Sequence, residues 1–357
     1  MKVIFVIQGL RSGGAERVVS VLSDEFSKKN IDVVIALTEQ WGNIAYKINP
    51  NCVICNLTNN NKKNVLINRF LNIYKLRSLF KSENPDVVIS FITRTNICAI
   101  IASIGLNIPV FVSERNNPMI DPRSKFTRLL RNLLYPWAKG CVFQTNFAMR
   151  CFSHKIQNIS KVIYNPINSD IYKVSKNLQR KKRIVALCRL NKQKNLSLLI
   201  KSFANIHHKF PDYILEIYGE GEERERLEKL IYALNLENKC FLMGTTKRPL
   251  EILATSEVFA LSSDYEGMSN ALIEALCCGC ACISTDSPAY SARELIINKK
   301  NGILVAVNDE EDFSNALNYI LSDTNGRNAI MCEAQNVEAK VNTENIVKEW
   351  IDFININ

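Results

Sequence analysis

The first 37 residues, MKVIFVIQGLRSGGAERVVSVLSDEFSKKNIDVVIAL, decide the fold class of this chain. Two runs within them, residues 2–7 and 32–37, consist almost wholly of Val, Ile, Phe, Ala and Leu. Unbroken apolar runs of this length are typical of parallel strands that are covered on both faces. Residues 15–29, between the two runs, have the periodicity of an amphipathic helix. A strand, a helix and a second strand of this kind form the βαβ unit of a doubly wound sheet.

The same alternation continues through the chain and begins again beyond a basic polar stretch at residues 173–182. The sequence therefore predicts an α/β protein with two doubly wound Rossmann-like domains, residues 1–167 and 168–342, that face each other across a cleft. A last helix, residues 343–357, is expected to cross back to the first domain. The further strands are expected at residues 86–91, 110–113, 140–144, 161–164, 183–187, 213–218, 240–242, 258–261, 281–285 and 303–305.

Charge is distributed unevenly between the two halves. The whole chain carries a formal net charge of +10, but residues 1–176 carry +14 and residues 177–357 carry −4. This asymmetry indicates an anionic partner of the first half, such as a membrane surface, a phosphorylated lipid or a nucleic acid. The alternative is a basic face that serves only solubility. No recognised nucleic-acid module is visible, so a nucleic-acid partner is not expected.

Composition excludes several other classes. Only 3 His are present, which argues against a zinc hydrolase. The 12 Cys follow no secretory signal, so reduced thiols and a cytoplasmic location are expected. No apolar run approaches the ~20 residues that span a bilayer. A protein that reaches a membrane would therefore be peripheral to it.

Glycines follow the first strand of the first domain and the second strand of the second domain. Gly13 and Gly14 open the first helix, and Gly219 and Gly221 open a helix after residues 213–218. Glycine lets a ligand approach the backbone, and a helix N-terminus favours anions. Neither site completes the G-x-G-x-x-G pattern of dinucleotide-binding proteins. Plain tight turns are the alternative at both places.

Two cationic side chains occupy positions that are suited to binding a diphosphate. Arg189 and Lys194 follow the first strand of the second domain and precede a helix. Charge-assisted hydrogen bonds from such a pair suit phosphate oxygens. A solvated turn is the alternative reading.

The strongest local pattern is residues 262–276, SSDYEGMSNALIEAL. Glu266 lies in the loop, Asn270 is expected to cap the following helix, and Glu274 lies one turn further among Ala, Leu and Ile. An acid on an apolar helix end usually has a partner, and a ribose with two hydroxyls would supply one. The backbone amides of Gly267 to Asn270 suit phosphate oxygens. Two ordinary surface acids are the alternative.

With these residues in place, the chain resembles the retaining glycosyltransferases of family 4, which have the GT-B fold. The resemblance covers essentially the whole chain and depends most on the paired glutamates Glu266 and Glu274. It extends to residues 283–286 and 293–295. Within the family the chain is most similar to bacterial enzymes that extend lipid-linked glycans, O-antigen or capsule, and residues 86–96, 113–116 and 131–136 contribute to that likeness.

The resemblance implies a role for each matching residue. Glu266 would meet the donor sugar, with Arg189 and Lys194 on the leaving UDP and Glu274 on the ribose. Many relatives have a His in the loop where this chain has Arg115, which could contact an acceptor or donor phosphate instead. The expected donor-binding residues are Gly14, Gly219, Gly244, Gly267, Met268, Ser269, Asn270 and Glu274.

The expected chemistry needs no divalent metal, because the chain has no D-x-D motif and cations take up the diphosphate charge. The resemblance implies front-face transfer of a hexose or N-acetylhexosamine with retention, from a nucleotide sugar that we expect to be UDP-linked. The acceptor would be a glycan on polyprenyl diphosphate, at the inner face of the cytoplasmic membrane.

A basic helix over residues 62–81 is the second candidate for handling the acceptor. Arg69, Arg77 and Lys81 are expected to meet an acceptor diphosphate or anionic headgroups. The alternative is a core helix with a solvated basic edge. Two other functions remain open for the whole chain: a UDP-sugar 2-epimerase with the same two-domain plan, and a non-enzymatic protein that binds polyanions or membranes.

Overall fold

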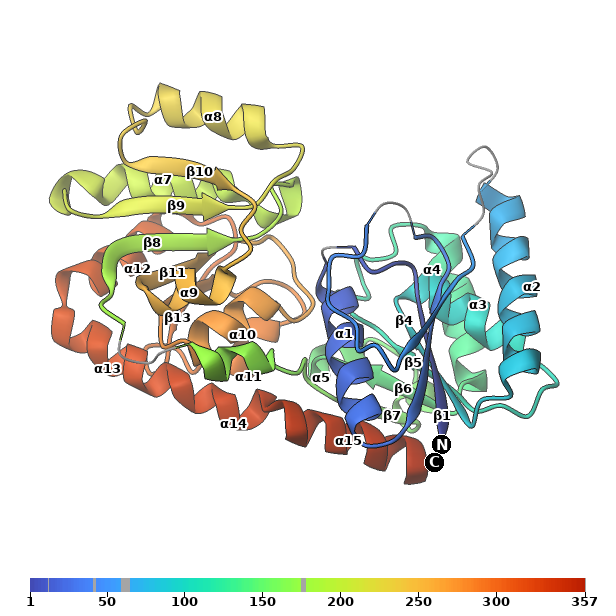
Figure 1. Cartoon of the computed structure of the whole chain (residues 1–357). Helices are drawn as coiled ribbons and strands as arrows, with labels where there is room; N and C mark the ends of the chain where they lie inside the picture. Colours follow the sequence, from blue (N-terminus) through green and yellow to red (C-terminus); the bar gives the residue numbers. More distant parts are fainter. Residues whose placement is uncertain (12, 41–42, 59–64, 175–177, 357) are drawn as a thin grey trace. The chain divides into compact units, whose positions relative to one another are not determined.

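The computed structural model of the chain describes all residues except 12, 41–42, 59–64, 175–177 and 357, and only the backbone of 65–67, 69, 169 and 356. The chain divides into two compact units (Figure 1). The first unit comprises Met1–Pro166 and Thr343–Asn357, and the second comprises Ile167–Asn342. The last helix therefore belongs to the first unit.

The first unit contains a seven-stranded parallel sheet with the order β3-β2-β1-β4-β5-β6-β7. The order reverses direction at β1, as in doubly wound folds. One strand, β3, was not expected from the sequence, because it is a short edge strand on which Val53 and Ile54 are exposed. The strands are β1 (Lys2–Ile7), β2 (Asp32–Leu37), β3 (Val53–Asn56), β4 (Val87–Phe91), β5 (Val110–Ser113), β6 (Gly140–Phe143) and β7 (Ser160–Val162).

Helices cover both faces of this sheet and bury a separate apolar cluster on each. The helices α1 and α15 pack on one face, and α2, α3, α4 and η1 pack on the other. The helices are α1 (Gly14–Lys28), α2 (Val65–Glu83), α3 (Thr93–Ser103), α4 (Lys125–Leu134), η1 (Tyr135–Trp137), α5 (Asn146–Arg150), α6 (His154–Gln157) and α15 (Thr343–Ile356).

The second unit contains a six-stranded parallel sheet with the order β10-β9-β8-β11-β12-β13. The direction again reverses next to the first strand of the unit, so the prediction of two doubly wound Rossmann-like units is confirmed. The strands are β8 (Lys181–Leu187), β9 (Ile214–Tyr218), β10 (Cys240–Gly244), β11 (Ser256–Leu261), β12 (Ala281–Thr285) and β13 (Ile303–Val305).

The helices of the second unit again lie on both faces. The helices α7, α8 and α12 share one apolar cluster with the sheet, while α9 and α10 contact β11 and β12 with residues outside that cluster. The helices are η2 (Ser169–Lys173), η3 (Lys192–Lys194), α7 (Leu196–Ile206), η4 (His207–Lys209), α8 (Arg224–Ala233), α9 (Pro249–Ala254), α10 (Asn270–Cys277), α11 (Ser291–Leu295), α12 (Glu310–Ser322), α13 (Thr324–Ala334), η5 (Gln335–Val337) and α14 (Glu338–Val341).

The returning helix α15 is an integral part of the first core. Trp350 is fully buried, and its ring lies 5.9 Å from that of Phe91. Ile346 and Val347, one turn earlier, are buried in the same cluster as Phe5. Helix α15 thus supplies side chains that complete the apolar core formed by the first 166 residues.

We expect Trp350→Ala to lower the free energy of unfolding of the first unit by about 3–5 kcal/mol, because it leaves a large cavity in a closed core. Urea unfolding followed by far-UV circular dichroism measures the change. Trp137→Ala is the matched control: this tryptophan is 64% exposed, so its loss should cost less than about 0.5 kcal/mol. Equal effects of the two substitutions would contradict the packing of α15.

Candidate functional site

Three loops of the second unit interlock at the carboxyl edge of its sheet. They follow β8, β9 and β11, and these strands are adjacent. The Leu190 amide donates to the carbonyl of Glu220 at 2.9 Å, and the Asp264 amide donates to the carbonyl of Gln193 at 2.9 Å. In doubly wound proteins ligands bind at this edge, beside the strand where the order reverses.

An ion pair between Lys194 and Glu266 joins the first and third of these loops. The Lys194 ammonium contacts Glu266 Oε1, and their side chains are only 14% and 10% exposed. Ser263 Oγ donates to the same carboxylate oxygen at 2.7 Å. Burial alone would lower the pKa of Lys194, because it favours the neutral amine. The charge of Glu266 and its contact with the ammonium have the opposite effect, and the pKa of Lys194 is raised overall. The ammonium group of Lys194 is therefore held charged at the edge of the sheet.

Glu274 lies on the helix that follows the loop. Glu274 is only 3% exposed and lies in the middle of α10. The N-cap of this helix is Ser269, whose hydroxyl accepts from the Leu272 amide at 3.3 Å. The expectation that Asn270 caps the helix was wrong: Asn270 is its first residue, because the serine one position earlier already has extended backbone angles and a suitable oxygen.

The glycines at residues 219 and 221 have a structural explanation. A Cβ on Gly219 would lie 1.8 Å from the carbonyl oxygen of Cys188, and one on Gly221 would lie 2.2 Å from that of Leu190. Gly219 also has a φ of +141°, which side chains rarely adopt. The two glycines thus let the loop after β9 press against the loop that carries Arg189, whose own side chain is exposed.

The remaining donor candidates of this unit lie on the same edge. The Gly219 amide donates to the carbonyl of Gly244 at 2.8 Å, at the end of β10. Gly267 is partly buried and Met268 is 5% exposed, both in the loop that carries Glu266. The donor candidates Gly219, Gly244, Gly267 and Met268 thus lie at the carboxyl edge of the second sheet.

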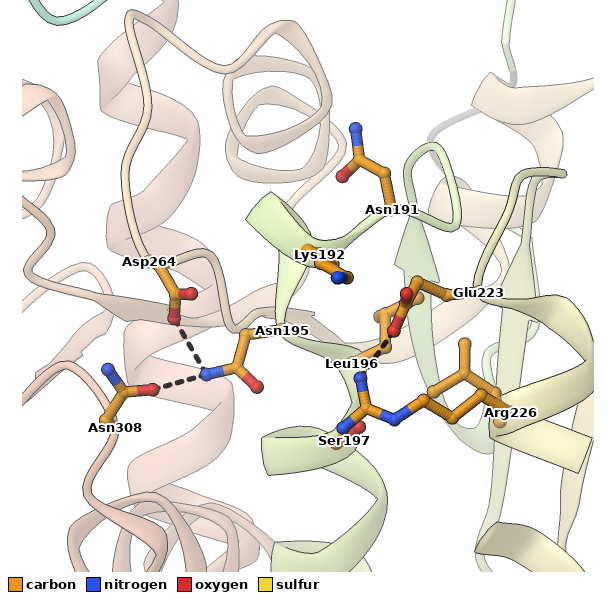
Figure 2. A pocket seen from close by; sticks show the side chains of 10 residues that line it. Asn191, Lys192, Asn195, Leu196, Ser197, Glu223, Arg226, Asp264 and Asn308 are labelled. Carbon is orange, nitrogen blue, oxygen red and sulfur yellow. Dashed lines mark hydrogen bonds and ion pairs between the residues drawn. The ribbon is translucent and has the colours of Figure 1, made fainter. Parts of the chain in front are cut away.

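A pocket that the sequence did not indicate lies beside this loop system (Figure 2). Its volume is about 260 Å³. The Asn195 amide bridges the carboxylate of Asp264 at 2.7 Å and the side-chain oxygen of Asn308 at 2.5 Å. Both asparagines have positive φ, which Asn tolerates better than most residues. The pocket is lined by Asn191, Lys192, Asn195, Leu196, Ser197, Glu223, Arg226, Leu227, Asp264 and Asn308.

The other candidates belong to the first unit. Gly14 is the exposed first residue of α1. Just before it, the Gly13 amide donates to the Tyr46 hydroxyl at 3.1 Å, and that hydroxyl donates to the Gly13 carbonyl at 2.8 Å. Tyr46 therefore fixes the turn that opens α1.

The side chain of Arg115 is directed into the interior of the first unit. Its Nη1 donates to Asn165 Oδ1 at 2.8 Å, and its guanidinium lies 4.9 Å from the ring centre of Phe91 and 5.7 Å from that of Trp350. Its Nε and Nη2 are buried and have no hydrogen-bond partner among the described residues. Burial lowers the pKa of this guanidinium. The arginine thus joins the end of β5 to the returning helix α15.

The basic residues expected to meet an acceptor lie on α2. Arg77 donates from Nη1 to the carbonyls of Ala102 and Ile104 at 3.0 and 2.6 Å, so it caps the end of α3. Lys81 is exposed near the end of α2. The side chain of Arg69, like residues 62–64 of the expected basic stretch, lies outside the described residues.

In the described part of the chain, no group of three or more His, Cys, Asp or Glu side chains is arranged to hold a metal ion. No helix there has the length and hydropathy required to cross a bilayer.

Family models and known proteins match this chain along its length. The family model described as glycosyl transferases group 1 matches residues 168–337, and the one described as glycosyltransferase family 4 matches residues 12–171. The chain is 30% identical, over 98% of both chains, to the N-acetylgalactosamine-N,N'-diacetylbacillosaminyl-diphospho-undecaprenol 4-alpha-N-acetylgalactosaminyltransferase of Campylobacter jejuni. A second N-acetyl-D-galactosaminyltransferase of that organism, also named for an undecaprenol-linked substrate, is 27% identical over 99% of this chain and 98% of its own.

Solved structures share the fold. HepE of Anabaena in complex with UDP and glucose superposes with a TM-score of 0.84 at 20% identity, over 99% of both chains. TarM of Staphylococcus aureus in a complex containing UDP has a TM-score of 0.83 at 16% identity, over 99% of both chains. At these identities the likeness supports the fold alone.

We expect Gly221→Ala to disorder the loop that carries Arg189 and Lys194, because the new methyl group would meet the Leu190 carbonyl. UDP affinity should fall at least about tenfold, and the free energy of unfolding by about 2 kcal/mol or more. Isothermal titration and urea unfolding measure the two changes. Gly105→Ala is the control, since a Cβ there meets nothing within 4 Å and only its φ of +73° is unfavourable. Unchanged UDP affinity in Gly221→Ala would contradict this packing.

Proposed function

This chain belongs to family 4 of the glycosyltransferases, and we propose that it transfers an N-acetylhexosamine or hexose from a UDP-sugar to a glycan on polyprenyl diphosphate. One observation carries the proposal. Two relatives that match the chain almost from end to end are named for transfer of N-acetylgalactosamine to diphospho-undecaprenol-linked saccharides.

The Lys194–Glu266 pair supports a donor site at the edge of the second sheet. In the proposed complex, Lys194 and Arg189 take up the negative charge that the departing diphosphate develops. Glu266 faces the sugar, and Glu274 binds the ribose hydroxyls. Because Glu266 already holds Lys194 charged and in place, little reorganisation is needed when a diphosphate arrives.

The proposed reaction retains the anomeric configuration by front-face attack. The acceptor hydroxyl approaches the sugar on the side from which the UDP leaves, and the leaving phosphate oxygen takes its proton. The backbone amides from Gly267 to Asn270, at the start of α10, are proposed to stabilise the phosphate charge, with no metal. The first unit is proposed to bind the acceptor, with Gly14 close to the donor and Arg69, Arg77, Lys81 and Arg115 as the candidate cations.

The two rival functions are less well supported. An epimerase of the same fold and a non-enzymatic polyanion-binding protein both fit a basic two-unit chain. The relatives that match the whole chain are, however, named as transferases. We further propose that the enzyme works peripherally at the inner face of the cytoplasmic membrane, where a polyprenyl-linked acceptor presents its diphosphate.

A donor panel tests the proposal directly. UDP-GalNAc, UDP-GlcNAc, UDP-Gal, UDP-Glc and GDP-mannose are each incubated with lipid-linked acceptors, and the product mass is measured. We expect a mass gain of one or more sugar residues with a UDP-sugar. Isomerisation of the donor without any glycosylated product would favour the epimerase instead.

We expect Glu266→Ala to lower kcat by about a thousandfold, because this carboxylate is proposed to act on the sugar. The Kd for UDP should change less than about threefold, because Lys194 can then pair with the diphosphate in place of Glu266. Glu274→Ala should instead raise the Kd for UDP at least about tenfold, because a charge-assisted bond to ribose is lost. Glu237→Ala, on an exposed loop of the same unit, is the control. The division of roles is wrong if Glu266→Ala loses UDP affinity and Glu274→Ala keeps it.

We expect turnover to persist in EDTA, within about twofold of the untreated rate, since cationic side chains are proposed to replace a metal at the diphosphate. Product formation is measured before and after dialysis against the chelator. Complete loss of turnover, restored by Mn²⁺ or Mg²⁺, would refute the metal-free mechanism.

A further inference from the structure

Four large apolar side chains form an exposed line on the first unit. Phe126, Leu129 and Leu133 on α4 and Trp137 on η1 are 69%, 67%, 65% and 64% exposed. Their spacings of three and four residues place them on one side of the helix. We call these four residues the α4 stripe. Single exposed apolar residues are ordinary, but a continuous line of four usually marks an interaction surface.

The opposite side of α4 fixes the direction in which the stripe points. Leu134 is buried in the cluster between α2, α3 and the sheet. Arg131 lies 4.5 Å from the ring centre of Phe152 and donates to the carbonyl of Pro118 at 3.2 Å. Ser124 caps the start of the helix by accepting from the Thr127 amide. With this side anchored, the stripe cannot rotate inward to join the core.

Positive charge lies at both ends of the stripe. Arg123 and Lys125 precede it and Lys139 follows it, and all three are exposed. Between residues 115 and 161 the sequence contains a single acid, Asp121. An apolar line with cations at its ends is complementary to a surface that is negative outside and apolar beneath.

We propose that the α4 stripe docks the enzyme on an anionic lipid bilayer, with its four apolar side chains in the interface and Arg123 and Lys125 on the headgroups. Helices that lie in the membrane interface typically have Trp, Phe and Leu on one face and Lys and Arg beside them, as the α4 stripe does. The inference rests on the proposed function, since a polyprenyl-linked acceptor would place the enzyme at such a surface.

The helix α2, which lies in the same layer as α4, also exposes aromatic side chains. Phe70 and Tyr74 on α2 are 74% and 73% exposed. Both α2 and α4 pack against α3, and all three helices cover the same face of the sheet (Figure 1). Two helices of one layer thus present aromatic side chains to solvent, and aromatic residues are enriched at membrane interfaces.

The test measures binding to vesicles of phosphatidylcholine alone and of phosphatidylcholine mixed with phosphatidylglycerol. We expect the wild type to bind the mixed vesicles, and Phe126→Gln/Leu129→Gln/Leu133→Gln to bind them about a hundredfold more weakly. Glutamine favours helix formation, so the fold should survive, which circular dichroism verifies. The matched control, Tyr232→Gln/Tyr319→Gln/Ile297→Gln, removes three exposed apolar residues from the second unit and should bind like the wild type.

Two further arms assign the contact to particular residues. Arg123→Gln/Lys125→Gln should lose most of the preference for phosphatidylglycerol, about fivefold for each charge. Brominated lipids should quench tryptophan fluorescence in the wild type, and Trp137→Phe should remove the quenching while binding persists. Equal binding of the stripe variant and the wild type would overturn the proposal. So would a wild-type dimer in solution that the stripe variant converts to monomers, because a second copy would then cover the stripe.

The same preparations separate this inference from the proposed function. Turnover of the wild type on a short water-soluble acceptor tests the transferase proposal without any vesicle. Vesicle binding without turnover would refute that proposal and leave the docking surface standing. If the wild type turns over the soluble acceptor but neither it nor any variant binds vesicles, only the docking surface is overturned.

Discussion

The contact between Lys194 and Glu266 sets the arrangement of the candidate donor site. Two opposite charges, each with little exposure to solvent, lie on loops that follow β8 and β11. Removing either partner would leave the other charge nearly buried and uncompensated, which is costly. Ser263 adds a hydrogen bond to the carboxylate, and the Ser262 hydroxyl donates to the Lys194 carbonyl at 2.8 Å. Charge and backbone are therefore fixed together before any ligand binds.

The close packing of backbones makes this contact possible. Gly219 and Gly221 bring the loop after β9 against the carbonyls of Cys188 and Leu190, where no side chain would fit. That support holds the loop with Arg189 and Lys194 at the edge of the sheet. The glycines thus act on the site through the neighbouring backbone, as in the tight-turn alternative, and the approach of a ligand to Gly219 and Gly221 stays a prediction.

The two units differ in what they offer to a ligand. The second unit is slightly acidic overall, and its site consists of fixed charges and the start of α10. The first unit is strongly basic and exposes the α4 stripe. Its Arg115 is directed into the core, between Phe91, Trp350 and Asn165. Arg115, for which the sequence suggested contact with an acceptor or donor phosphate, therefore stabilises the position of the returning helix.

The sequence by itself determined the two doubly wound units, because apolar strands, amphipathic helices and turn glycines are local patterns. It also located the segments that are proposed to carry chemistry. It missed β3, a short exposed edge strand, and it named Asn270 in place of Ser269 as the cap of α10. Only the tertiary structure decided that Lys194 pairs with Glu266, 72 residues away, and that Arg77 caps α3. It alone revealed the α4 stripe, because exposure depends on which side of a helix the rest of the fold covers.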